Sequence, residues 1–467
     1  MPELLEPDIC VIGSGQGAVA AAIGAAALGS RPVLVRFGPS SVALKTQALI
    51  AAAERAQLVR SAGSFGVAAS GFSVDFGKVQ EHVRRVMDLA ALNEAPERLA
   101  GLGVRVIGGA PRFTDPNTLA IDDSFKVKAK HFLLASGSST IAPSIEGLNG
   151  VSYLTPASIL DLVECPQHLI VVGATPNGLE LAQAFLRLGT KVTVIDPEKP
   201  LPKEDAECVA ILLQSLRDEG IVLRQASLAS VAKGRDGLAV TLDSADEPEA
   251  IHGSHILIAS ARRPAVNDLD LDKGRIKHGP AGIAVDDRLR TSNPKVYAIG
   301  EAAGALSVQA ANAHAGVVIR NVLLNTGAKV NDDVIPRVIF TDPGYAHVGL
   351  DVQRGKALYR TIRILRWPFY ENDRAQAEGD TAGHVKIVAM SDGTIIGATI
   401  VGRGAADHIG TWALAVERRL RVPDLAGWVL PYPTRAEAGK YALTGFRGSG
   451  LTRNWLRRIM SLLRRRG

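Results

Sequence analysis

Two short glycine-rich segments have the residue types and the spacing that bind the pyrophosphate of a dinucleotide. The first, G-S-G-Q-G-A at 13–18, follows the apolar run 8–12 and precedes an alanine-rich helix. Gly13 allows a tight turn, Gly15 lets the backbone approach the phosphates, and Ala18 lets the helix pack against the strand. The positive end of the helix then faces the phosphates. The segment therefore predicts a strand–turn–helix nucleotide site.

The second segment, G-A-T-P-N-G at 173–178, repeats this pattern later in the chain. It follows the apolar run 169–172 and precedes a predicted helix. Gly173 and Gly178 take the positions of the first and third glycine. Thr175 stands at the second position, where its side chain crowds the pyrophosphate without excluding it. A second nucleotide site is therefore predicted.

The two repeats differ at the residue that would meet the ribose. Predicted strands follow at 32–36 and 191–195, and Arg36 and Asp196 stand at the same distance from the first glycine of their repeats. An acid here accepts hydrogen bonds from ribose hydroxyls, so Asp196 predicts a preference for NADH over NADPH. Its alternative is a solvated acid in a turn before a proline. Arg36 cannot accept such bonds. It could instead suit a 2′-phosphate, and the first site could then hold a different nucleotide.

The elements that position these residues are strand–helix–strand units, which bind ligands at the carboxyl ends of parallel strands. The chain has 467 residues, too many for one hydrophobic core, so two or three domains are expected. Hydrophobic residues make up 46% of the chain, aromatic residues only 5%, and there are 47 glycines. This composition favours packed α/β layers over an aromatic-rich β-sandwich.

The net charge of +6 comes from one end of the chain. Residues 447–467 contain no acid, and their arginines account for the whole excess. Apolar residues in this tail recur at steps of three and four, which predicts an amphipathic helix with flanking guanidinium groups. Such a helix could lie on an anionic membrane surface, or it could dock on the protein's own surface. Nucleic acid is not the expected partner, because no nucleic-acid-reading motif accompanies the arginines. These arginines are Arg447, Arg453, Arg457, Arg458, Arg464, Arg465 and Arg466.

The three cysteines, Cys10, Cys165 and Cys208, are far apart in sequence and form no metal-binding or C-x-x-C spacing. Neither a disulfide scaffold nor a cysteine metal site is expected, and a reducing compartment is indicated. The start of the chain does not resemble a secretory signal. No apolar run approaches the roughly 18 residues of a membrane-spanning helix. We therefore expect a cytoplasmic protein without a metal, peripheral to the inner face of the membrane if the tail binds lipid.

Further motifs resemble those of the pyridine nucleotide–disulfide oxidoreductases, the family of dihydrolipoamide dehydrogenase, glutathione reductase and mercuric reductase. Gly137 lies in L-A-S-G-S at 134–138, where members usually have A-T-G. The segment V-Y-A-I-G-E at 296–301 resembles the family's second flavin motif. The resemblance implies that Gly300 and Glu301 bind FAD, with Glu301 replacing the usual aspartate that binds the ribityl chain. Other family-like segments, up to about residue 443, are 178–182, 259–264, 336–343 and 373–375.

The resemblance implies an α/β fold with two Rossmann-like dinucleotide-binding domains, one for FAD and one for NAD, and a C-terminal α+β dimerisation domain. The FAD-binding domain would comprise residues 1–150 and 268–330, and the NAD-binding domain residues 151–267. The dimerisation domain would follow at 331–446, before the basic amphipathic tail at 447–467. A homodimer is the implied assembly.

The segment after the second predicted strand lacks the residues of the family's usual chemistry. Members have a redox-active cysteine pair there, whereas residues 37–47 contain no cysteine and form a shorter connection. Aligning on the residues that follow puts Gln47 at the family's lysine, whereas aligning on lysine would use Lys45. A dithiol relay needs a thiolate. Disulfide, lipoamide and mercuric reductase activities are therefore not expected.

The family's acid–base pair also differs. Members offer H-P-T-x-x-E from the partner subunit, and this chain has Y-P-T-R-A-E at 432–437. Glu437 is kept, but a tyrosine with an ordinary pKa of about 10 is a poor general base. Tyr432 could donate a hydrogen bond to an acceptor, stack on a planar ring, or only bury its hydroxyl at an interface. By resemblance, Glu180 would lie near the contact between nicotinamide and flavin and could pair with Lys45.

These residues favour an FAD-dependent NADH oxidoreductase that passes electrons from flavin directly to a small diffusible acceptor such as a quinone. The alternative is a dimeric scaffold or nucleotide sensor that has kept the fold and lost the chemistry. Arg36, Thr175 and Tyr432 favour this alternative.

Overall fold

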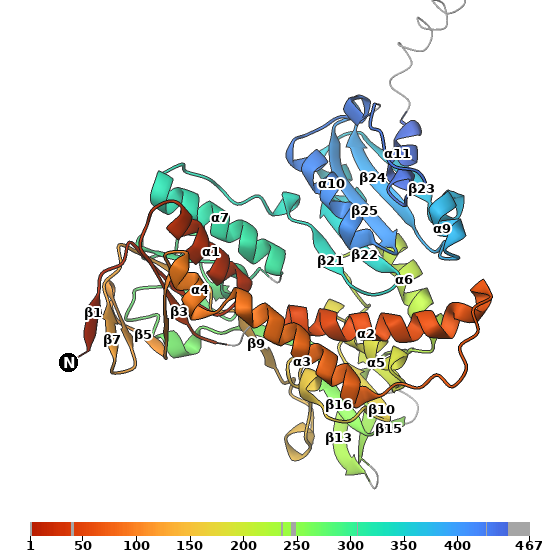
Figure 1. Ribbon diagram of the computed structural model, residues 1–467, viewed down its shortest axis with the longest axis horizontal. Helices are drawn as coiled ribbons and strands as arrows, with labels where there is room; N and C mark the ends of the chain where they lie inside the picture. Colours follow the sequence, from red (N-terminus) through yellow and green to blue (C-terminus); the bar gives the residue numbers. More distant parts are fainter. Residues whose placement is uncertain are drawn as a thin grey trace, which may run out of the picture. The chain divides into compact units, whose positions relative to one another are not determined.

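The computed structural model describes residues 2–38, 42–234, 237–243, 249–305, 307–425 and 427–446. They belong to two compact units (Figure 1). The first comprises the chain up to Lys199 and Gly220–Val330, and the second comprises Pro200–Glu219 and the chain from Asn331. The predicted basic tail at 447–467 lies outside the described residues.

Two parallel sheets organise the first unit. The strand order is β20-β8-β2-β3-β4 in the larger sheet and β12-β11-β10-β16 in the smaller, and all neighbouring strands are parallel. Each order changes direction beside its first strand, between β2 and β8 and between β10 and β16, and ligands bind at such switch points. The strands are β2 (Ile9–Ile12), β3 (Pro32–Arg36), β4 (Arg105–Gly108), β8 (His131–Leu134) and β20 (Val296–Ala298), then β10 (His168–Val172), β11 (Lys191–Asp196), β12 (Val222–Gln225) and β16 (His255–Ile258).

The larger sheet is covered differently on its two faces because side chains alternate along each strand. Ile9 and Val11 of β2 pack in one apolar cluster with α1 (Gln16–Ala27) and α7 (Val308–Leu324). Cys10 and Ile12 face the other way, into a cluster with a four-stranded sheet of order β1-β7-β6-β5. Its strands are β1 (Glu3–Leu5), β5 (Pro111–Asp115), β6 (Thr118–Ile121) and β7 (Phe125–Val127).

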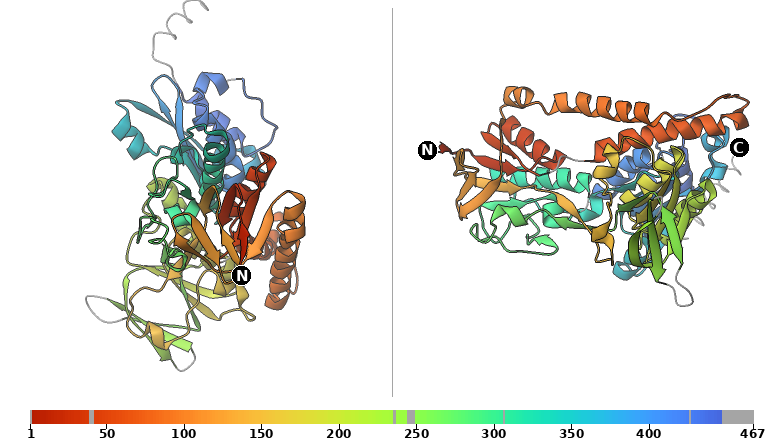
Figure 2. Two further views of the ribbon diagram at one scale, coloured as in Figure 1. Left: turned by 90° about the vertical axis from the view of Figure 1, so that its left-hand side faces the viewer. Right: turned by 90° about the horizontal axis from the view of Figure 1, so that it is seen from below.

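Several further elements complete the first unit. The helices α2 (Ala43–Ser61) and α3 (Phe76–Asn93) lie side by side, and the right-hand view of Figure 2 shows both along their length. An antiparallel ribbon of β9 (Ser138–Ile141) and β17 (Ala261–Pro264) links the parts that contain the two parallel sheets. The remaining elements are α4 (Pro96–Gly101), α5 (Pro176–Arg187), the antiparallel strands β13 (Ser227–Gly234), β14 (Gly237–Asp243) and β15 (Ala250–Gly253), and the hairpin of β18 (His278–Gly279) and β19 (Gly282–Ile283).

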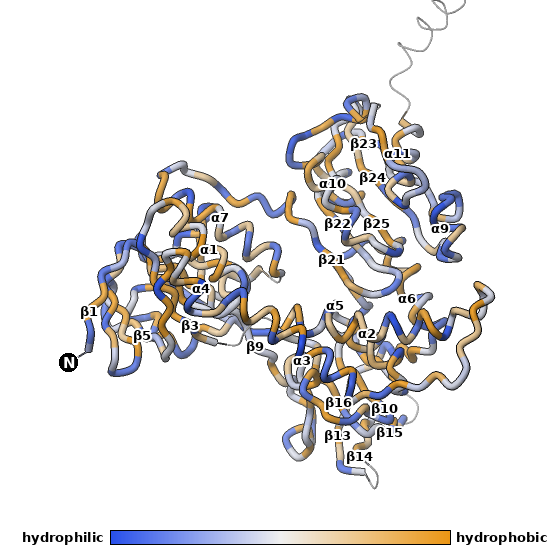
Figure 3. The backbone as a smooth tube through the Cα atoms, viewed as in Figure 1, coloured by the Kyte–Doolittle hydropathy of each residue, from blue (hydrophilic) through white to orange (hydrophobic). Residues whose placement is uncertain are grey.

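The second unit is an antiparallel sheet of order β21-β22-β25-β24-β23 with helices against it. Every residue of β25 is buried. Figure 3 shows β25 and β24 in mainly hydrophobic colours. Residues of α10 and α11 belong to the same apolar cluster as these strands. The elements are β21 (Arg337–Ile339), β22 (Gly344–Gly349), β23 (Ile362–Pro368), β24 (His384–Met390), β25 (Ile395–Gly402), α6 (Ala206–Glu219), α8 (Val352–Leu358), α9 (Asp373–Ala377), α10 (Ala405–Glu417) and α11 (Glu437–Thr444).

A buried ion cluster joins α6 to this sheet. Lys386 of β24 is 3% exposed, and its Nζ lies 2.6 Å from a carboxylate oxygen of Asp205 and 2.6 Å from one of Glu207. Burial alone would lower the pKa of Lys386, but hydrogen bonds to the two carboxylates raise it overall. Burial alone would likewise raise the pKa of Glu207, yet Lys386 and Arg366 hold it at about 2. The cluster is therefore charged near neutral pH and fixes the start of α6.

The predicted α/β fold with dinucleotide-binding and dimerisation domains is confirmed by this architecture. The predicted strand at 32–36 coincides with β3, and Asp196 is the last residue of β11. The position of α6 was not expected. This helix lies in sequence between β11 and β12 of the smaller parallel sheet, but it belongs to the second unit. The domain boundaries proposed from the sequence remain a prediction.

Candidate functional site

The first glycine-rich turn connects β2 to α1 at the switch point of the larger sheet. Gly13 has a φ of +150°, and a Cβ there would lie 2.2 Å from the carbonyl oxygen of Ala135. Gly15 is the N-cap of α1, and a Cβ there would meet nothing within 4 Å. No side chain caps this helix. The N–H groups of its first turn and the open space at Gly15 therefore form a place where an anion can bind.

Small residues hold α1 and α7 close together beside this turn. A Cβ at Gly17 would lie 2.9 Å from the Cβ of Ala311, and a Cβ at Gly300 would lie 2.9 Å from the same atom. Ala18 is fully buried in the cluster that α1 forms with the sheet. A side chain at Gly17 would therefore push α1 and α7 apart, one at Gly300 would clash with α7, and a residue larger than Ala18 would disturb the packing of α1 in this cluster.

A polar group lies next to the turn, at the carboxyl ends of β8 and β20. Arg262 of β17 donates from Nε to the hydroxyl of Ser138 at 2.8 Å, and its Nε lies 3.2 Å from a carboxylate oxygen of Glu301. A Cβ at Gly137 would lie 3.7 Å from the other oxygen of that carboxylate. Both charged side chains are partly exposed, at 29% and 26%. Glu301 therefore stands beside the turn with acceptor positions open to a hydroxyl of a ligand.

These residues fit a flavin dinucleotide. The open first turn of α1 offers N–H groups to a pyrophosphate, and Glu301 offers carboxylate oxygens to a hydroxyl such as those of a ribityl chain. The hydroxyl of Ser136, at the end of β8, is buried and has no hydrogen-bond partner within the described residues. An unsatisfied buried hydroxyl is costly, and a ligand at this turn would offer it a partner.

Arg36 stands where an acid was the usual residue. It ends β3 and is partly buried, and its Nη2 donates to the backbone carbonyl of Glu94 at the C-terminal end of α3. Cations are favourable at such helix ends. The hydroxyl of Ser14 donates to the carbonyl of Phe37 at 3.2 Å and so ties the turn to the end of β3.

The second turn, between β10 and α5, has the same backbone but offers fewer N–H groups. Gly173 has a φ of +111°, and a Cβ there would lie 2.7 Å from the Cα of Ser260. Thr175 is the N-cap of α5, and its hydroxyl accepts from the N–H of Gly178 at 3.2 Å and donates to the carbonyl of Ala259 at 2.8 Å. Pro176, which follows, has no N–H. A phosphate is therefore held here by fewer bonds than at the first turn.

Asp196 is held in place by this second turn. One carboxylate oxygen accepts from the N–H of Ala174 at 2.7 Å, and the other accepts from the N–H of Glu198 at 2.9 Å. Each oxygen keeps a further lone pair for a ribose hydroxyl. The carboxylate is thus oriented before any ligand arrives.

The predicted catalytic residues of the first unit lie on helices that pack against each other. Lys45 is in α2, and Glu180 is buried in α5. Lys45 Nζ forms an ion pair with Asp161, which is 70% exposed. Its pairing with Glu180 remains a prediction.

The cysteines are dispersed through the fold. Cys10 is in β2, Cys165 precedes β10, and Cys208 is in α6; all three are free. Burial raises the pKa of the Cys10 and Cys208 thiols strongly, and burial also raises that of Cys165. None of the three is therefore prepared to react as a thiolate.

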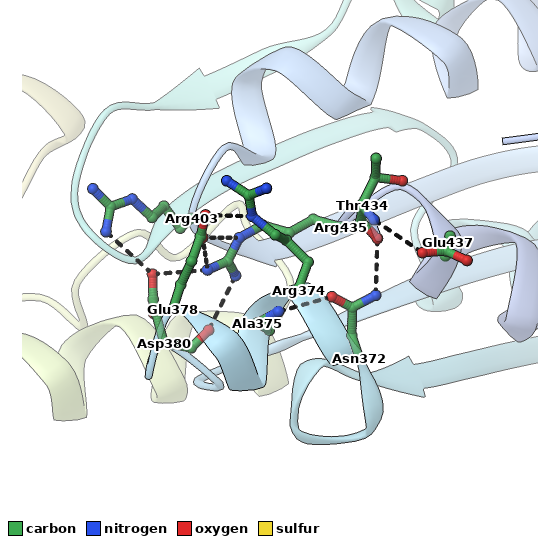
Figure 4. Close-up of polar contacts among 9 residues, drawn as sticks. All are labelled: Asn372, Arg374, Ala375, Glu378, Asp380, Arg403, Thr434, Arg435 and Glu437. Carbon is green, nitrogen blue, oxygen red and sulfur yellow. Dashed lines mark hydrogen bonds and ion pairs between the residues drawn. The ribbon is translucent and has the colours of Figure 1, made fainter. Parts of the chain in front are cut away.

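In the second unit, the tyrosine and the glutamate of Y-P-T-R-A-E have different hydrogen-bond partners. The Tyr432 side chain is exposed, and its hydroxyl donates to Asp373 at 2.9 Å, which raises the pKa of the phenol. Glu437 accepts instead from the N–H of Thr434 at 2.9 Å, as Figure 4 shows. Tyr432 is thus a hydrogen-bond donor near neutral pH, and Glu437 stabilises the start of α11.

The arginine of the same motif forms the centre of an ionic network (Figure 4). Arg435 is 6% exposed and donates to Glu378 at 2.8 Å and to the backbone carbonyl of Asp380 at 3.0 Å. Arg374 also pairs with Glu378, and Arg403 lies 3.8 Å from Asp380. The neighbouring hollow has a volume of about 210 Å³. Since both acids are engaged by arginines, the motif is anchored in the domain by charge.

Sequence analysis did not identify Arg262, Ser138 or Ser136 as part of the first site. A signal existed for Arg262, because it lies in the family-like segment 259–264, but its partner Glu301 is distant in sequence. No group of three or more metal-ligating side chains occurs among the residues that the structure describes. Within the same part of the chain, no helix is long and apolar enough to cross a membrane.

Comparisons with known proteins agree with this geometry. Residues 7–316 match the family model described as pyridine nucleotide-disulphide oxidoreductase, and residues 335–443 match the model of its dimerisation domain. The chain is 33% identical over 459 residues to the mercuric reductase of Streptomyces lividans, covering 94% of this chain and 96% of the relative. It is 32% identical over 447 residues to the dihydrolipoyl dehydrogenase of Geobacillus stearothermophilus, covering 93% and 94%.

Solved structures show the same fold. LpdA from Mycobacterium tuberculosis superposes with a TM-score of 0.84 at 26% identity, covering 94% of this chain and 99% of that one. The flavoprotein disulfide reductase RclA from Escherichia coli, as its Cu(II) complex, gives a TM-score of 0.82 at 21% identity, covering 95% and 100%. The chain therefore belongs to the pyridine nucleotide-disulphide oxidoreductase family, a family of FAD-dependent oxidoreductases that use a pyridine nucleotide.

Proposed function

We propose that this protein is an FAD-dependent NADH oxidoreductase without a disulfide relay, which passes electrons from flavin directly to a diffusible acceptor such as a quinone. The observation that supports this most directly is the state of the thiols. No cysteine occurs in residues 37–47, and Cys10 and Cys208 are buried with raised pKa values. Two nucleotide turns of suitable geometry remain, so the part of the family's chemistry that needs no thiol is kept.

The residues of the first site would hold the cofactor. The N–H groups at the start of α1 would bind the pyrophosphate of FAD, and Glu301 would accept a hydrogen bond from a ribityl hydroxyl. Gly137 leaves room for the ligand beside that carboxylate. FAD, when bound, supplies the capacity to accept a hydride and to release the electrons to a second substrate.

The residues of the second site would bind and select NADH. Asp196 accepts bonds from ribose hydroxyls, and a 2′-phosphate in its place would be repelled by the carboxylate. The smaller number of N–H groups at the second turn suits a substrate that must leave after each turnover. The overall reaction balances as NADH, one proton and a quinone giving NAD⁺ and a hydroquinone.

A homodimer is part of the proposal, since the dimerisation domain of the family is present over residues 335–443. Tyr432, from the motif that family members offer across the dimer, would have to turn its hydroxyl away from Asp373 in order to donate a hydrogen bond to an oxygen of the acceptor. The hydrogen bond to Asp373 keeps this phenol protonated.

Spectroscopy of the purified protein tests the proposal. We expect yellow flavin absorbance near ~450 nm after incubation with FAD, bleaching by NADH, and recovery on addition of a quinone. Lipoamide and Hg²⁺ should not support turnover. A flavin that NADH cannot reduce would refute the proposal, and turnover of lipoamide would refute the absence of a thiol relay.

A second candidate function is a dimeric nucleotide sensor without turnover. It is favoured by Arg36, which cannot accept bonds from a ribose, and by Thr175, whose hydroxyl occupies an N–H of the second turn. Calorimetry with FAD and NADH separates the two candidates. Binding of either nucleotide without electron transfer to any quinone would support the sensor.

A further inference from the structure

We propose that Arg36 weakens the hold on the adenosine ribose of FAD, so that FAD is an exchangeable cofactor in this protein. The inference rests on the proposed function, since it concerns the same first site. The inference adds that Arg36 is the residue that limits the affinity for FAD.

The first step is the equivalence of Arg36 and Asp196. Each is the last residue of the strand that follows a glycine-rich turn and its helix: Arg36 ends β3 and Asp196 ends β11. Their strands occupy the same place in the two sheets, beside the strand that leads into the turn. The second site therefore shows what an acid at this position does.

The acid of the second site is held against its turn and has lone pairs open to a ribose. Asp196 accepts an N–H of the turn through one oxygen and an N–H of the following loop through the other. Two oxygens with lone pairs to spare remain to accept the two ribose hydroxyls, which gives two charge-assisted hydrogen bonds.

Arg36 cannot make those bonds. A guanidinium has only donors, and Arg36 already directs one of them to the carbonyl of Glu94. Ribose hydroxyls could only accept hydrogen bonds from the guanidinium. Their own protons would lack the carboxylate acceptor that Asp196 offers in the second site. The residue is suited to the C-terminal end of α3, where the carbonyls are unsatisfied, and that structural use explains its presence.

The other contacts of FAD are kept. The open turn at Gly15 receives the pyrophosphate, and Glu301 is placed for the ribityl chain. We therefore expect FAD to bind, but with an affinity low enough for release on dialysis.

The test compares FAD binding to the full chain and to three variants, measured by quenching of flavin fluorescence and by calorimetry. Arg36→Gln removes the charge and adds an amide oxygen as an acceptor, and Arg36→Glu places a carboxylate at this position. Arg31→Gln is the matched control: it removes the same charge at the other end of β3, where Arg31 is 77% exposed and pairs with Asp8. Thermal melting of the proteins without FAD reports any effect on the fold.

We expect Arg36→Gln to bind FAD several-fold more tightly than the wild type and Arg36→Glu at least tenfold more tightly, about 1.4 kcal/mol. Arg31→Gln should bind as the wild type does. The proposal is overturned if neither Arg36 variant gains affinity, or if no protein binds FAD. It is also overturned if the wild type prefers adenosine 2′,5′-bisphosphate to ADP and Arg36→Gln loses that preference, because Arg36 would then recognise a phosphate. Failure of NADH to reduce bound flavin would refute the proposed function without altering this order of affinities.

Discussion

Replacing Lys386 by methionine should destabilise the second unit more than any surface ion-pair change. Methionine keeps the length of the aliphatic chain but removes the charge that two carboxylates share at 2.6 Å each. Asp205 is 9% exposed, so its charge would be left buried. Removal of one partner from a buried ion pair costs about 3–5 kcal/mol. Glu207 is 45% exposed and keeps Arg366 at 2.9 Å, so water can compensate part of the loss.

The lower end of this range, about 3 kcal/mol, is therefore the expected loss. For a domain of this size it corresponds to a fall in melting temperature of roughly 6–12 °C. Differential scanning calorimetry at pH 7 or urea unfolding followed by tryptophan fluorescence measures it, since Trp367 and Trp412 belong to this unit.

Arg366→Met is the matched control. This substitution removes a positive charge from the neighbouring strand β23. Arg366 also pairs with Glu207, but the side chains of Arg366 and Glu207 are about half exposed, at 46% and 45%. An exposed pair contributes at most about 1 kcal/mol. Adding Asp205→Asn to Lys386→Met should recover part of the lost stability, because the uncompensated charge is then gone.

The reasoning is refuted if Lys386→Met costs no more than Arg366→Met. It is also refuted if the double variant is less stable than Lys386→Met alone, because the buried Asp205 charge would then not be the source of the loss.

Three further outcomes are expected. The stability difference between wild type and Lys386→Met should shrink as the pH falls from 5 to 2. The pKa of Glu207 lies at about 2 in the folded state, below its ordinary value, so the stability that its ionised form contributes is full above the ordinary value and is lost on acidification. A stability difference that grows toward low pH would contradict this. Asp196→Asn should lower the preference for NADH over NADPH by raising the KM for NADH, with steady-state kinetics as the readout and unchanged FAD affinity as the control. Native protein should show no rapidly reacting thiol with a disulfide reagent before or after NADH, whereas denatured protein should show three; a pair of thiols exposed by NADH would demonstrate a relay.

An experiment also separates the two expectations for the tail, which are binding to an anionic membrane and docking on the protein's own surface. Residues 447–467 contain arginines and no acid, so the full chain should sediment with anionic vesicles in a salt-dependent manner and not with neutral vesicles. Truncation after Phe446 should abolish the sedimentation and leave FAD binding unchanged. Equal sedimentation of the truncated chain would exclude the tail as the membrane contact.

Local sequence patterns were sufficient to predict the nucleotide turns. The glycine spacing after an apolar run determines both the turn and the helix that follows, because the constraints are steric and lie within a few residues. The structure accordingly has Gly13 and Gly173 at positive φ, each with a backbone neighbour closer than 3 Å to the place of a Cβ. The predicted strand at 191–195 was also correct to within one residue, since β11 ends at Asp196.

Contacts between distant segments were not predictable in this way. Arg262 meets Glu301 across 39 positions, and Lys386 meets Asp205 across 181. Nothing in the local sequence of α6 distinguishes it from the other helices of the nucleotide-binding region. Its contacts in the second unit are with β22, β25 and Lys386, which all lie far away in the chain. Hydrophobic periodicity predicts which face of a helix is buried, but not against which sheet.

The contrast between local patterns and distant contacts also applies to the cysteine and histidine positions of the family's motifs. Cysteine and histidine are missing from short motifs, and the sequence alone shows their absence. In the structure, Glu437 accepts the N–H of Thr434. Tyr432, at the position of the family's histidine, donates to Asp373. Arg36, at the position of the ribose-binding acid, donates to the end of α3. A chain that keeps the geometry of both nucleotide turns but has no cysteine in residues 37–47 fits our proposal of electron transfer from NADH through flavin to a diffusible acceptor.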